Sequence, residues 1–391
     1  MYNRLRSAIT IALFPLLVCP AGLLGGTRAA SPSPLSERRS GDGADSVSVV
    51  VERPSRRIVT DAGAGGYQAF PDVCRLKNGE LMCVFYAGYG HVSHPSAQLP
   101  KGGRVCAVRS KDDGSTWGAP TTVVDTPDDD RDPSICCLPD GTLLCNFFTY
   151  GMFGECDTCV VQSKDGGQTW CEPQLVAPSF ATSSPIRRLR SGRLLLPIYT
   201  VDGGGKRSYS GVTISNDRGR TWSSAHPIAE KSGKTLDETD IFERKDGTLL
   251  AVMREVMCAA ESRDGGVTWT GLRDLGFPGH CPYLLETRDG VLLMAHRLPE
   301  TSLHFSVDEG RTWTGPILID HFIGAYPSLV PLRDGRILCV FYEEGAHSAI
   351  RAVTIKVSRI RTAGSFNRMT RTIAPTIRAA ARSRTGPAQL P

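Results

Sequence analysis

The stretch Ser110–Trp117 reads SKDDGSTW, and four further copies of this octapeptide follow it along the chain. They read SKDGGQTW (163–170), SNDRGRTW (215–222), SRDGGVTW (262–269) and SVDEGRTW (306–313). The pattern S-x-D-x-G-x-T-W recurs at intervals of 53, 52, 47 and 44 residues, and its last position accounts for all five tryptophans of the chain. A repeat of this period indicates a propeller or a solenoid, so the fold is read from it.

The octapeptide has the chemistry of a hairpin turn. An Asp side chain accepts hydrogen bonds from the backbone N–H groups that follow it, and Gly supplies the positive φ that the turn requires. Thr and Trp then begin the outgoing strand, with the Trp as an apolar plug beneath the turn. We therefore interpret the five repeated acids as turn-formers and not as catalytic acids: Asp112, Asp165, Asp217, Asp264 and Asp308.

A second repeat precedes each of these turns, and it consists of an apolar strand, a turn ending in Gly and another apolar strand. Each unit thus supplies four strands, which is one propeller blade. The second repeat has six copies against five Asp turns: 70–86, 132–148, 184–199, 239–253, 281–296 and 326–342. The sequence therefore predicts an all-β fold, a six-bladed β-propeller with Asp-box hairpins.

The sixth unit lacks the Asp turn and ends with a strand, Ile350–Val357. We expect the N-terminal segment SVSVVVE (Ser46–Glu52) to pair with this last blade and close the ring, because closure removes a free sheet edge.

The segments outside the ring have the composition of an export signal, a linker and a tail. In residues 1–30, Arg4 and Arg6 precede the apolar run ITIALFPLLV and small residues follow, which predicts a signal peptide and a periplasmic or secreted protein. That run is too short to span a membrane. Residues 31–45 are predicted as a linker, 46–360 as the propeller and 361–391 as a basic, disordered tail.

Charge and cysteine content exclude some classes of partner. The net charge is +5, but residues 58–360 hold 31 basic and 36 acidic residues, so the excess positive charge belongs to the ends. The ring gives no support for nucleic-acid binding. Cys156 and Cys159 form a single C-x-x-C without a second pair at zinc spacing, so a local disulfide or two free thiols is favoured over a metal. We expect no cofactor, and we expect a monomer.

The candidate site follows from the topology. In a propeller the innermost strands begin around the central axis, so the residues at their starts converge on one face. These residues, with the ends of the second strands, are rich in acids, arginines, histidines and tyrosines, which predicts a pocket for a polar, anionic ligand. They include Tyr67, Arg131, Asp132, Glu238, Asp240, His280 and Tyr326, and then His91, His94, Arg254, His296, Arg297, Glu343 and Glu344.

The Asp-box octapeptides and six units resemble the sialidase (neuraminidase) superfamily over residues 58–357. The resemblance implies a six-bladed propeller and an exo-glycosidase that removes a terminal acidic sugar from a glycan. Family positions match in DETDIFERKDGTLLAVMRE, which holds Glu238 and Arg254, and in the Y-P-S-L and F-Y-E of the sixth unit, which hold Tyr326 and Glu343. Arg297, shortly before the last Asp box, is a further match.

The resemblance also implies roles for these residues. It makes Tyr326 the nucleophile, Glu238 its base, Glu343 the brace of an arginine, and Arg254 and Arg297 ligands of the sugar carboxylate. A neutral Tyr hydroxyl suits a sugar whose carboxylate repels a carboxylate nucleophile, and sialidases depart from the two-carboxylate rule in this way. Planar guanidinium groups bind carboxylates in a bidentate manner.

The chain departs from the family at two positions. Ala69 stands where family members have the first carboxylate-binding Arg, although Arg131 holds the equivalent place one blade later. The loop after the second strand of the first blade, GYGHVSHP, offers His91 and His94 in place of the family's acidic Asp. We therefore keep His91 and Asp132 as candidate acids, and Arg131, Asp240 and Tyr67 as candidate binding residues.

Two other functions stay open at this stage. One is a non-catalytic carbohydrate-binding propeller, which the loss of the arginine at Ala69 favours. The other is a polysaccharide lyase that uses a Tyr–His pair.

Overall fold

Every copy of the Asp turn joins the third and fourth strands of a small antiparallel sheet. The computed structural model describes residues 38–40, 45–200, 208–229, 233–254, 256–321, 324–345 and 347–361. The predicted export signal and the predicted tail beyond Arg361 lie outside the described residues. Across the described part of the chain, no helix has the length and hydropathy that a membrane span requires.

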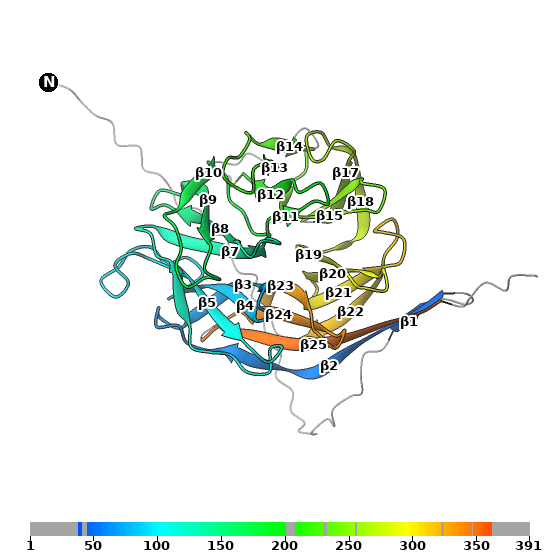
Figure 1. Ribbon diagram of the computed structural model, residues 1–391, viewed down its shortest axis with the longest axis horizontal. Helices are drawn as coiled ribbons and strands as arrows, with labels where there is room; N and C mark the ends of the chain where they lie inside the picture. Colours follow the sequence, from blue (N-terminus) through cyan, green and yellow to red (C-terminus); the bar gives the residue numbers. More distant parts are fainter. Residues whose placement is uncertain are drawn as a thin grey trace, which may run out of the picture. The chain divides into compact units, whose positions relative to one another are not determined.

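The described strands form six sheets arranged in a ring, which confirms the predicted six-bladed propeller (Figure 1). Blade 1 contains β3 (Tyr67–Arg75), β4 (Leu81–Gly88), β5 (Arg104–Ser110) and β6 (Thr121–Val124). Blade 2 contains β7 (Asp129–Cys137), β8 (Leu143–Tyr150), β9 (Cys156–Ser163) and β10 (Gln174–Pro178). Blade 3 contains β11 (Arg187–Arg188), β12 (Leu194–Tyr199), β13 (Ser210–Ser215) and β14 (His226–Ile228).

Blade 4 contains β15 (Asp237–Glu243), β16 (Leu249–Arg254), β17 (Val256–Ser262) and β18 (Thr270–Pro278). Blade 5 contains β19 (His280–Glu286), β20 (Leu292–Arg297), β21 (Thr301–Ser306) and β22 (Thr314–Asp320). Blade 6 contains β23 (Gly324–Pro331), β24 (Ile337–Glu343) and β25 (Ala349–Arg361), and its outer strand is β2 (Asp45–Val59). In each blade the strand named first is the innermost.

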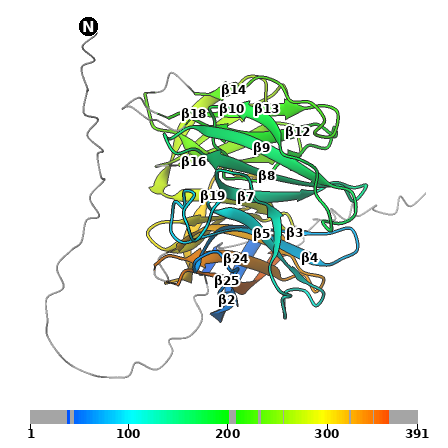
Figure 2. The same cartoon turned by 90° about the vertical axis from the view of Figure 1, so that its left-hand side faces the viewer.

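The ring closes as the sequence predicts. β2 pairs antiparallel with β25 from Asp45 opposite Arg361 to Val59 opposite Ile350, and the two strands lie together at the lower end of the ring in Figure 2. A short strand, β1 (Arg38–Ser40), adds to the outer side of β2. Part of the segment predicted as a linker is therefore a strand.

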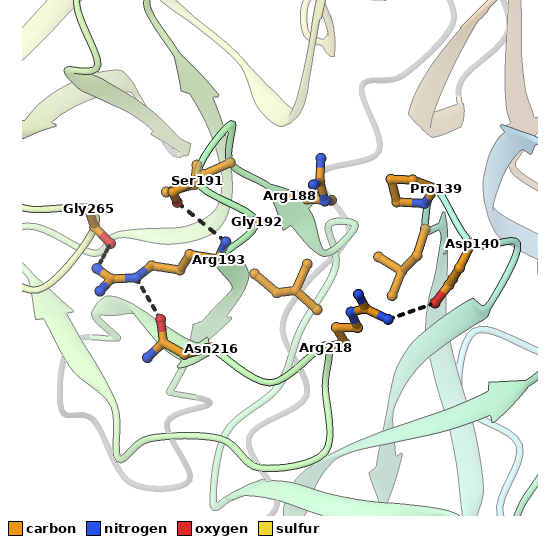
Figure 3. A pocket seen from close by; sticks show the side chains of 12 residues that line it. Pro139, Asp140, Arg188, Ser191, Gly192, Arg193, Asn216, Arg218 and Gly265 are labelled. Carbon is orange, nitrogen blue, oxygen red and sulfur yellow. Dashed lines mark hydrogen bonds and ion pairs between the residues drawn. The ribbon is translucent and has the colours of Figure 1, made fainter.

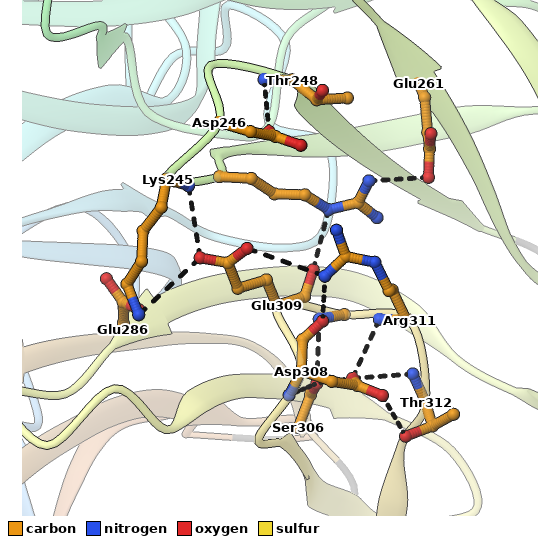
Figure 4. A network of polar contacts seen from close by, with 12 residues as sticks. Lys245, Asp246, Thr248, Glu261, Glu286, Ser306, Asp308, Glu309, Arg311 and Thr312 are labelled. Atoms are coloured by element: carbon orange, nitrogen blue, oxygen red, sulfur yellow. Dashed lines mark hydrogen bonds and ion pairs between the residues drawn. The ribbon is translucent and has the colours of Figure 1, made fainter.

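The Asp turns have the predicted chemistry. In the fifth copy, Asp308 accepts hydrogen bonds from the hydroxyl groups of Ser306 (2.7 Å) and Thr312 (2.6 Å) and from the backbone N–H of Thr312 (2.9 Å), as Figure 4 shows. These contacts recur at the other four turns. Each Trp is half-buried and packs against a different hydrophobic cluster.

Each of the five Asp turns is also held by the preceding blade. A side chain from the preceding blade donates a hydrogen bond to a backbone carbonyl inside the turn, which satisfies an acceptor that would otherwise face the blade interface. The pairs are Arg56 with Gly114, Arg109 with Gly166, Gln162 with Gly219, Arg193 with Gly265 and Arg273 with Gly310.

The core lies between neighbouring blades. One cluster packs Phe85 and Tyr86 of blade 1 against Val340 and Tyr342 of blade 6, all of them fully buried. Near the axis, carboxylates tie the inner strands together. Asp72 accepts a hydrogen bond from Ile135 N of the next blade (2.7 Å), and Asp240 accepts one from Leu284 N (2.6 Å). The inner strands are therefore fixed where they approach the candidate site.

Candidate functional site

A pocket of about 370 Å³ opens at the ends of the second strands. Since the Asp turns follow the third strands, which run antiparallel to the second, this mouth is on the face opposite to them. The lining residues come from all six blades: His91, Val92, Arg131, Asp132, Phe148, Tyr150, Cys156, Tyr199, Glu238, Arg254, Arg297, Tyr326 and Tyr342. No Asp-turn residue is among them, as predicted.

In five of the blades the inner strand contains a bulge, and one residue lies within each bulge. In these strands the pairing register shifts by one residue, and the residue within the bulge has a φ of 43–54°. Such a conformation is uncommon for residues other than Gly and concentrates at functional sites. The five residues are Phe70, Asp132, Glu238, Cys281 and Tyr326. The sequence placed these residues just before the inner strands, whereas the structure places them within the strands.

Tyr326 and Glu238 form a hydrogen-bonded pair. The Tyr326 hydroxyl donates to Glu238 Oε1 at 2.7 Å, within the reach that a nucleophile and its base require. Arg254 Nη1 donates to the same oxygen at 2.5 Å, and the Cys281 N–H donates to Oε2 at 3.0 Å. Glu238 is 3% exposed, so three donors compensate a buried carboxylate.

These contacts separate the pKa values of the pair. Burial alone would raise the pKa of Glu238, but the Arg254 charge and hydrogen bonds from the side chains of Tyr326 and Cys281 together hold it below its ordinary value. Burial and the nearby charges of Asp132 and Glu238 raise the pKa of Tyr326 well above its ordinary value. The free pocket therefore holds a neutral phenol beside an ionised carboxylate, which is the state that a Tyr nucleophile with a Glu base requires.

The three predicted arginines line the same pocket but have different partners. Arg254 is held by Glu238 and, at 3.1 Å, by Asp237. Arg297 Nη2 contacts His280 Nδ1 at 3.0 Å. Burial, and then Arg254, lower the pKa of His280 to about 4, so its ring is neutral near pH 7 and Nδ1 accepts the bond. Among the described residues no carboxylate forms an ion pair with Arg297, whose Nε has no partner and is buried.

Arg131 is enclosed by aromatic rings. Its guanidinium carbon lies 5.4–5.8 Å from four ring centroids, those of Phe70, Tyr86, Phe148 and Tyr150. The carboxylates of Asp129 and Asp132 form ion pairs with Arg131 that are longer than a hydrogen bond, with N–O distances of 3.6 Å and 3.9 Å. These cation–π contacts fix the guanidinium at the wall of the pocket.

Of the two candidate acids, Asp132 has the more suitable ionisation. Burial raises its pKa to about 6, and Oδ2 accepts a hydrogen bond from the Ser183 hydroxyl at 2.8 Å. Oδ1 is buried and has no hydrogen-bond partner, with Arg131 Nε 3.9 Å away. In contrast, loss of solvent around the ring and the Arg131 charge lower the pKa of His91. A protonated Asp132 is therefore available near pH 6, whereas the lowered pKa of His91 makes its ring the weaker candidate for a protonated acid.

The structure places three predicted binding residues outside the pocket lining. Asp240 is fully buried and forms an ion pair with Arg187 (2.5 and 2.7 Å) at the axis. Glu343 braces arginines as the resemblance implies, but these are Arg57 and Arg351 (2.6 Å to Arg351), neither of which lines the pocket. The Tyr67 hydroxyl donates to Glu344 at 3.0 Å and lies 3.2 Å from His91 Nδ1, so Tyr67 supports the loop of His91.

The sequence reasoning missed the aromatic part of the lining. Phe148, Tyr199 and Tyr342 stand near the ends of second strands, the positions that supply Arg254 and Arg297 in blades 4 and 5. A comparison of the six units at this position could have identified them.

Cys156, which also lines the pocket, and Cys159 are free thiols. Within the described ranges, no cluster of His, Cys, Asp and Glu has the arrangement of a metal site.

A larger hollow of about 680 Å³ lies on the Asp-turn face, between blades 2, 3 and 4 (Figure 3). Two of its arginines are engaged by neighbouring groups: Arg218 pairs with Asp140 at 3.4 Å, and Arg193 donates to the Asn216 side chain at 3.0 Å and to the Gly265 carbonyl at 2.9 Å. The described residues that line it include no Tyr, Glu or His. The smaller pocket on the opposite face is therefore the candidate site.

Comparisons with known proteins agree with this fold. The family model of the BNR repeat-like domain matches residues 104–340. A sialidase of Micromonospora viridifaciens is 27% identical over 48% of this chain and 33% of its own length. A sialidase of Bacteroides fragilis (strain YCH46) is 27% identical over 46% of this chain and 36% of its own length. The chain thus matches about a third of the length of these two relatives.

Solved structures share the fold at low identity. A protein of unknown function from Dyadobacter fermentans DSM 18053 has a TM-score of 0.66 with 22% identity, covering 78% of this chain and 99% of its own. The Hadza microbial sialidase Hz136 has a TM-score of 0.61 with 18% identity, covering 79% of this chain and 69% of its own. The Trypanosoma rangeli sialidase has a TM-score of 0.60 with 15% identity, covering 77% of this chain and 59% of its own.

Proposed function

The chain belongs to the BNR repeat-like family within the sialidase superfamily, and on that premise we propose that it is an exo-glycosidase that removes a terminal acidic sugar, a sialic acid or a related one, from a glycan. The observation that carries the proposal is the Tyr326–Glu238 hydrogen bond of 2.7 Å inside a pocket lined by three arginines. We also propose that the protein acts after export, in the periplasm or outside the cell, on the glycan alone and without a cofactor.

The arginines would bind the acidic end of the sugar. Arg297 is the strongest candidate, because it lacks a carboxylate partner among the described residues and a ligand carboxylate would supply one. Arg254 is engaged by Glu238 and Asp237, so it would share its guanidinium between the base and the ligand. Arg131, fixed by aromatic side chains, would face the ligand from the opposite side of the propeller.

The proposed reaction has two steps. In the first, Tyr326 Oη bonds to the anomeric carbon, Glu238 accepts the phenol proton, and the glycosidic bond breaks while protonated Asp132 gives its proton to the leaving oxygen. In the second, ionised Asp132 takes a proton from water, the water oxygen bonds to the anomeric carbon, and Tyr326 leaves and recovers its proton from Glu238. The same carboxyl group thus serves as acid and then as base.

Replacing Tyr326 by Phe tests the mechanism. We expect Tyr326→Phe to lose most of its turnover of an aryl glycoside of sialic acid, by about 10²-fold or more, while its affinity for free sialic acid changes little. In the Tyr326→Phe/Glu238→Gln double variant, turnover should fall little further, because residues that act as one unit are not additive. Full activity of Tyr326→Phe would exclude Tyr326 as the nucleophile.

One observation favours a second function. Ala69 is fully buried in β3 and does not reach the pocket, so blade 1 supplies no arginine. A propeller that binds an acidic glycan without cleaving it is the alternative. Wild-type protein that binds free sialic acid but hydrolyses no member of a panel of aryl glycosides and polysaccharides would support this alternative. Release of unsaturated sugars from a polysaccharide would support a lyase.

A further inference from the structure

A buried carboxylate beside the pocket holds a loop of blade 1. Asp129, the first residue of β7, is fully buried. Its Oδ1 accepts hydrogen bonds from the Tyr86 hydroxyl (2.8 Å) and from Gly103 N (3.1 Å), and its Oδ2 accepts one from Ser93 N (3.1 Å). Ser93 and Gly103 belong to the segment between β4 and β5, so one carboxylate from blade 2 binds this segment at two points.

The same segment brings His91 to the pocket. His91 and Val92, just before Ser93, line the pocket. The segment is closed on itself by a hydrogen bond from Gly103 N to the Ser93 carbonyl (2.8 Å), and the Ser93 hydroxyl accepts a bond from Tyr89 N (2.9 Å). The position of His91 therefore depends on where Ser93 is held.

The groups around the Asp129 carboxylate are closely packed. A Cβ atom on Gly103 would overlap the Asp129 carboxylate and the Tyr86 ring, and one on Gly88 would overlap the Ser93 hydroxyl. Both glycines flank the segment, at the end of β4 and just before β5. Close backbone approach of this kind is a use for which Gly is suited.

Asp129 also faces the arginine of its own strand. Arg131 Nη1 lies 3.6 Å from Asp129 Oδ2, the oxygen that binds Ser93 N. The carboxylate is thus shared between the His91 segment and the guanidinium at the pocket wall. Removal of its negative charge would change both at once.

We propose that Asp129 is a positioning residue that sets the places of His91 and Arg131 in the pocket from outside it. The catalytic consequence rests on the proposed glycosidase function, whereas the structural consequence for His91 does not.

The next residue provides a matched control. Asp130 is also fully buried and lies in the same strand. Its carboxylate accepts hydrogen bonds from the backbone N–H and the hydroxyl of Thr126, each at 2.7 Å, and no hydrogen bond or ion pair joins it to the described residues of the His91 segment. Replacement of either Asp by Asn keeps the size of the side chain and removes a buried carboxyl group.

The experiment compares Asp129→Asn with Asp130→Asn. Thermal unfolding of both variants measures the general cost of the change. NMR spectra of protein labelled at His report the His91 ring, assigned by its loss in His91→Gln. We expect Asp129→Asn to shift the His91 resonances and Asp130→Asn to leave them in place. Gly103→Ala, which keeps the Asp129 charge but displaces the segment, should shift them as Asp129→Asn does.

Kinetics then test the catalytic consequence. With an aryl sialoside as substrate we expect kcat/KM to fall by about tenfold or more in Asp129→Asn and by less than about twofold in Asp130→Asn, each at a temperature well below its Tm. If Asp129→Asn and Asp130→Asn shift the His91 resonances equally, the proposal is overturned. If the wild-type protein cleaves no acidic glycoside, the proposed function fails, but the His91 comparison still decides whether Asp129 positions the segment.

Discussion

The five bulge residues of the inner strands have a left-handed backbone conformation, which costs L residues about 1–2 kcal/mol each. The conformation is kept because the flanking residues are fixed in the inner strands, and it directs Asp132, Glu238 and Tyr326 toward one another. The sequence identified these three residues because acids and tyrosines are recognisable at a repeated position. It could not show the bulge, since a positive φ of a residue other than Gly depends on strand pairing across the blade.

The ion pairs are the part of the site that the sequence could not assign. Asp240 and Glu238 are two residues apart in β15, yet only Glu238 reaches the pocket. The bulge between Asp237 and Asp240 changes which side chains share a face, and Arg187 from blade 3 then binds Asp240. A pairing between blades is set by three-dimensional neighbours, so no local pattern reveals it.

At the residue scale, Arg297→Lys should weaken the binding of free sialic acid by about tenfold. A charge-assisted hydrogen bond contributes about 1.5–3 kcal/mol, and the ammonium group cannot reproduce the planar fork. Titration calorimetry of the wild type and the variant measures the change. Arg311→Lys, in an Asp turn on the other face, is the control. Wild-type affinity in Arg297→Lys would show that the ligand carboxylate binds elsewhere.

Asp132 should make stability fall as the pH rises. Its pKa is about 6 in the folded protein and 3.8 ordinarily, so between these values the folded state binds more protons and its free energy of unfolding decreases with pH. The loss is on the order of 2–3 kcal/mol above pH 6. The difference in Tm between Asp132→Asn and the wild type should therefore be more positive at pH 8 than at pH 4. Burial also raises the pKa of Asp72 to about 6 and that of Asp130 to about 7, but both residues are present in the two proteins compared. A difference that does not change with pH would contradict the raised pKa.

At the scale of elements, the Asp turns and strands were predictable because each depends on local chemistry. The Asp–Ser–Thr contacts close within eight residues, and alternation of apolar residues gives the strands. The clamps between blades, such as Arg109 on the carbonyl of Gly166, were not predictable because they join residues about one blade apart. Blade 3 also departs from the repeat, since its inner strand β11 has two residues and no left-handed bulge.

Trp222→Ala tests the contribution of one Asp turn. The ring packs against the cluster that holds Leu144, Leu194 and Leu196. Because Trp222 is half-buried, we expect the free energy of unfolding to fall by about 2–3 kcal/mol, below the 3–5 kcal/mol typical of a fully buried aromatic. Chemical denaturation measures this value, and affinity for sialic acid should not change. Leu175→Ala, at an exposed position in blade 2, serves as the control. An unchanged free energy would show that the Trp is not a structural plug.

At the scale of the whole molecule, the number of blades and the closure by the N-terminal strand were both predictable, because six strand–turn–strand units and five Asp turns leave one blade incomplete. The shape of the pocket was not, because its lining comes from six blades.

Closure makes a prediction about truncation. A chain that begins at Thr60 lacks β2, which leaves β25 as an open edge. It also lacks Val47, Val49 and Val51, so the core residues of their cluster become exposed. We expect this chain to lose cooperative thermal unfolding and to aggregate, whereas a chain that begins at Asp45 keeps β2 and unfolds like the longer protein. Calorimetry and light scattering measure both properties. A soluble, cooperatively unfolding chain from Thr60 would show that the five remaining complete blades are sufficient.

The register of β2 against β25 also determines how the ring responds to mechanical force. Asp45 faces Arg361, so the chain enters and leaves the ladder at the same end. Tension applied through the two ends would separate these strands one pair at a time, as in unzipping, instead of shearing all their hydrogen bonds together. In single-molecule pulling, the ring should open at low force at this seam, and the blades should then extend in succession.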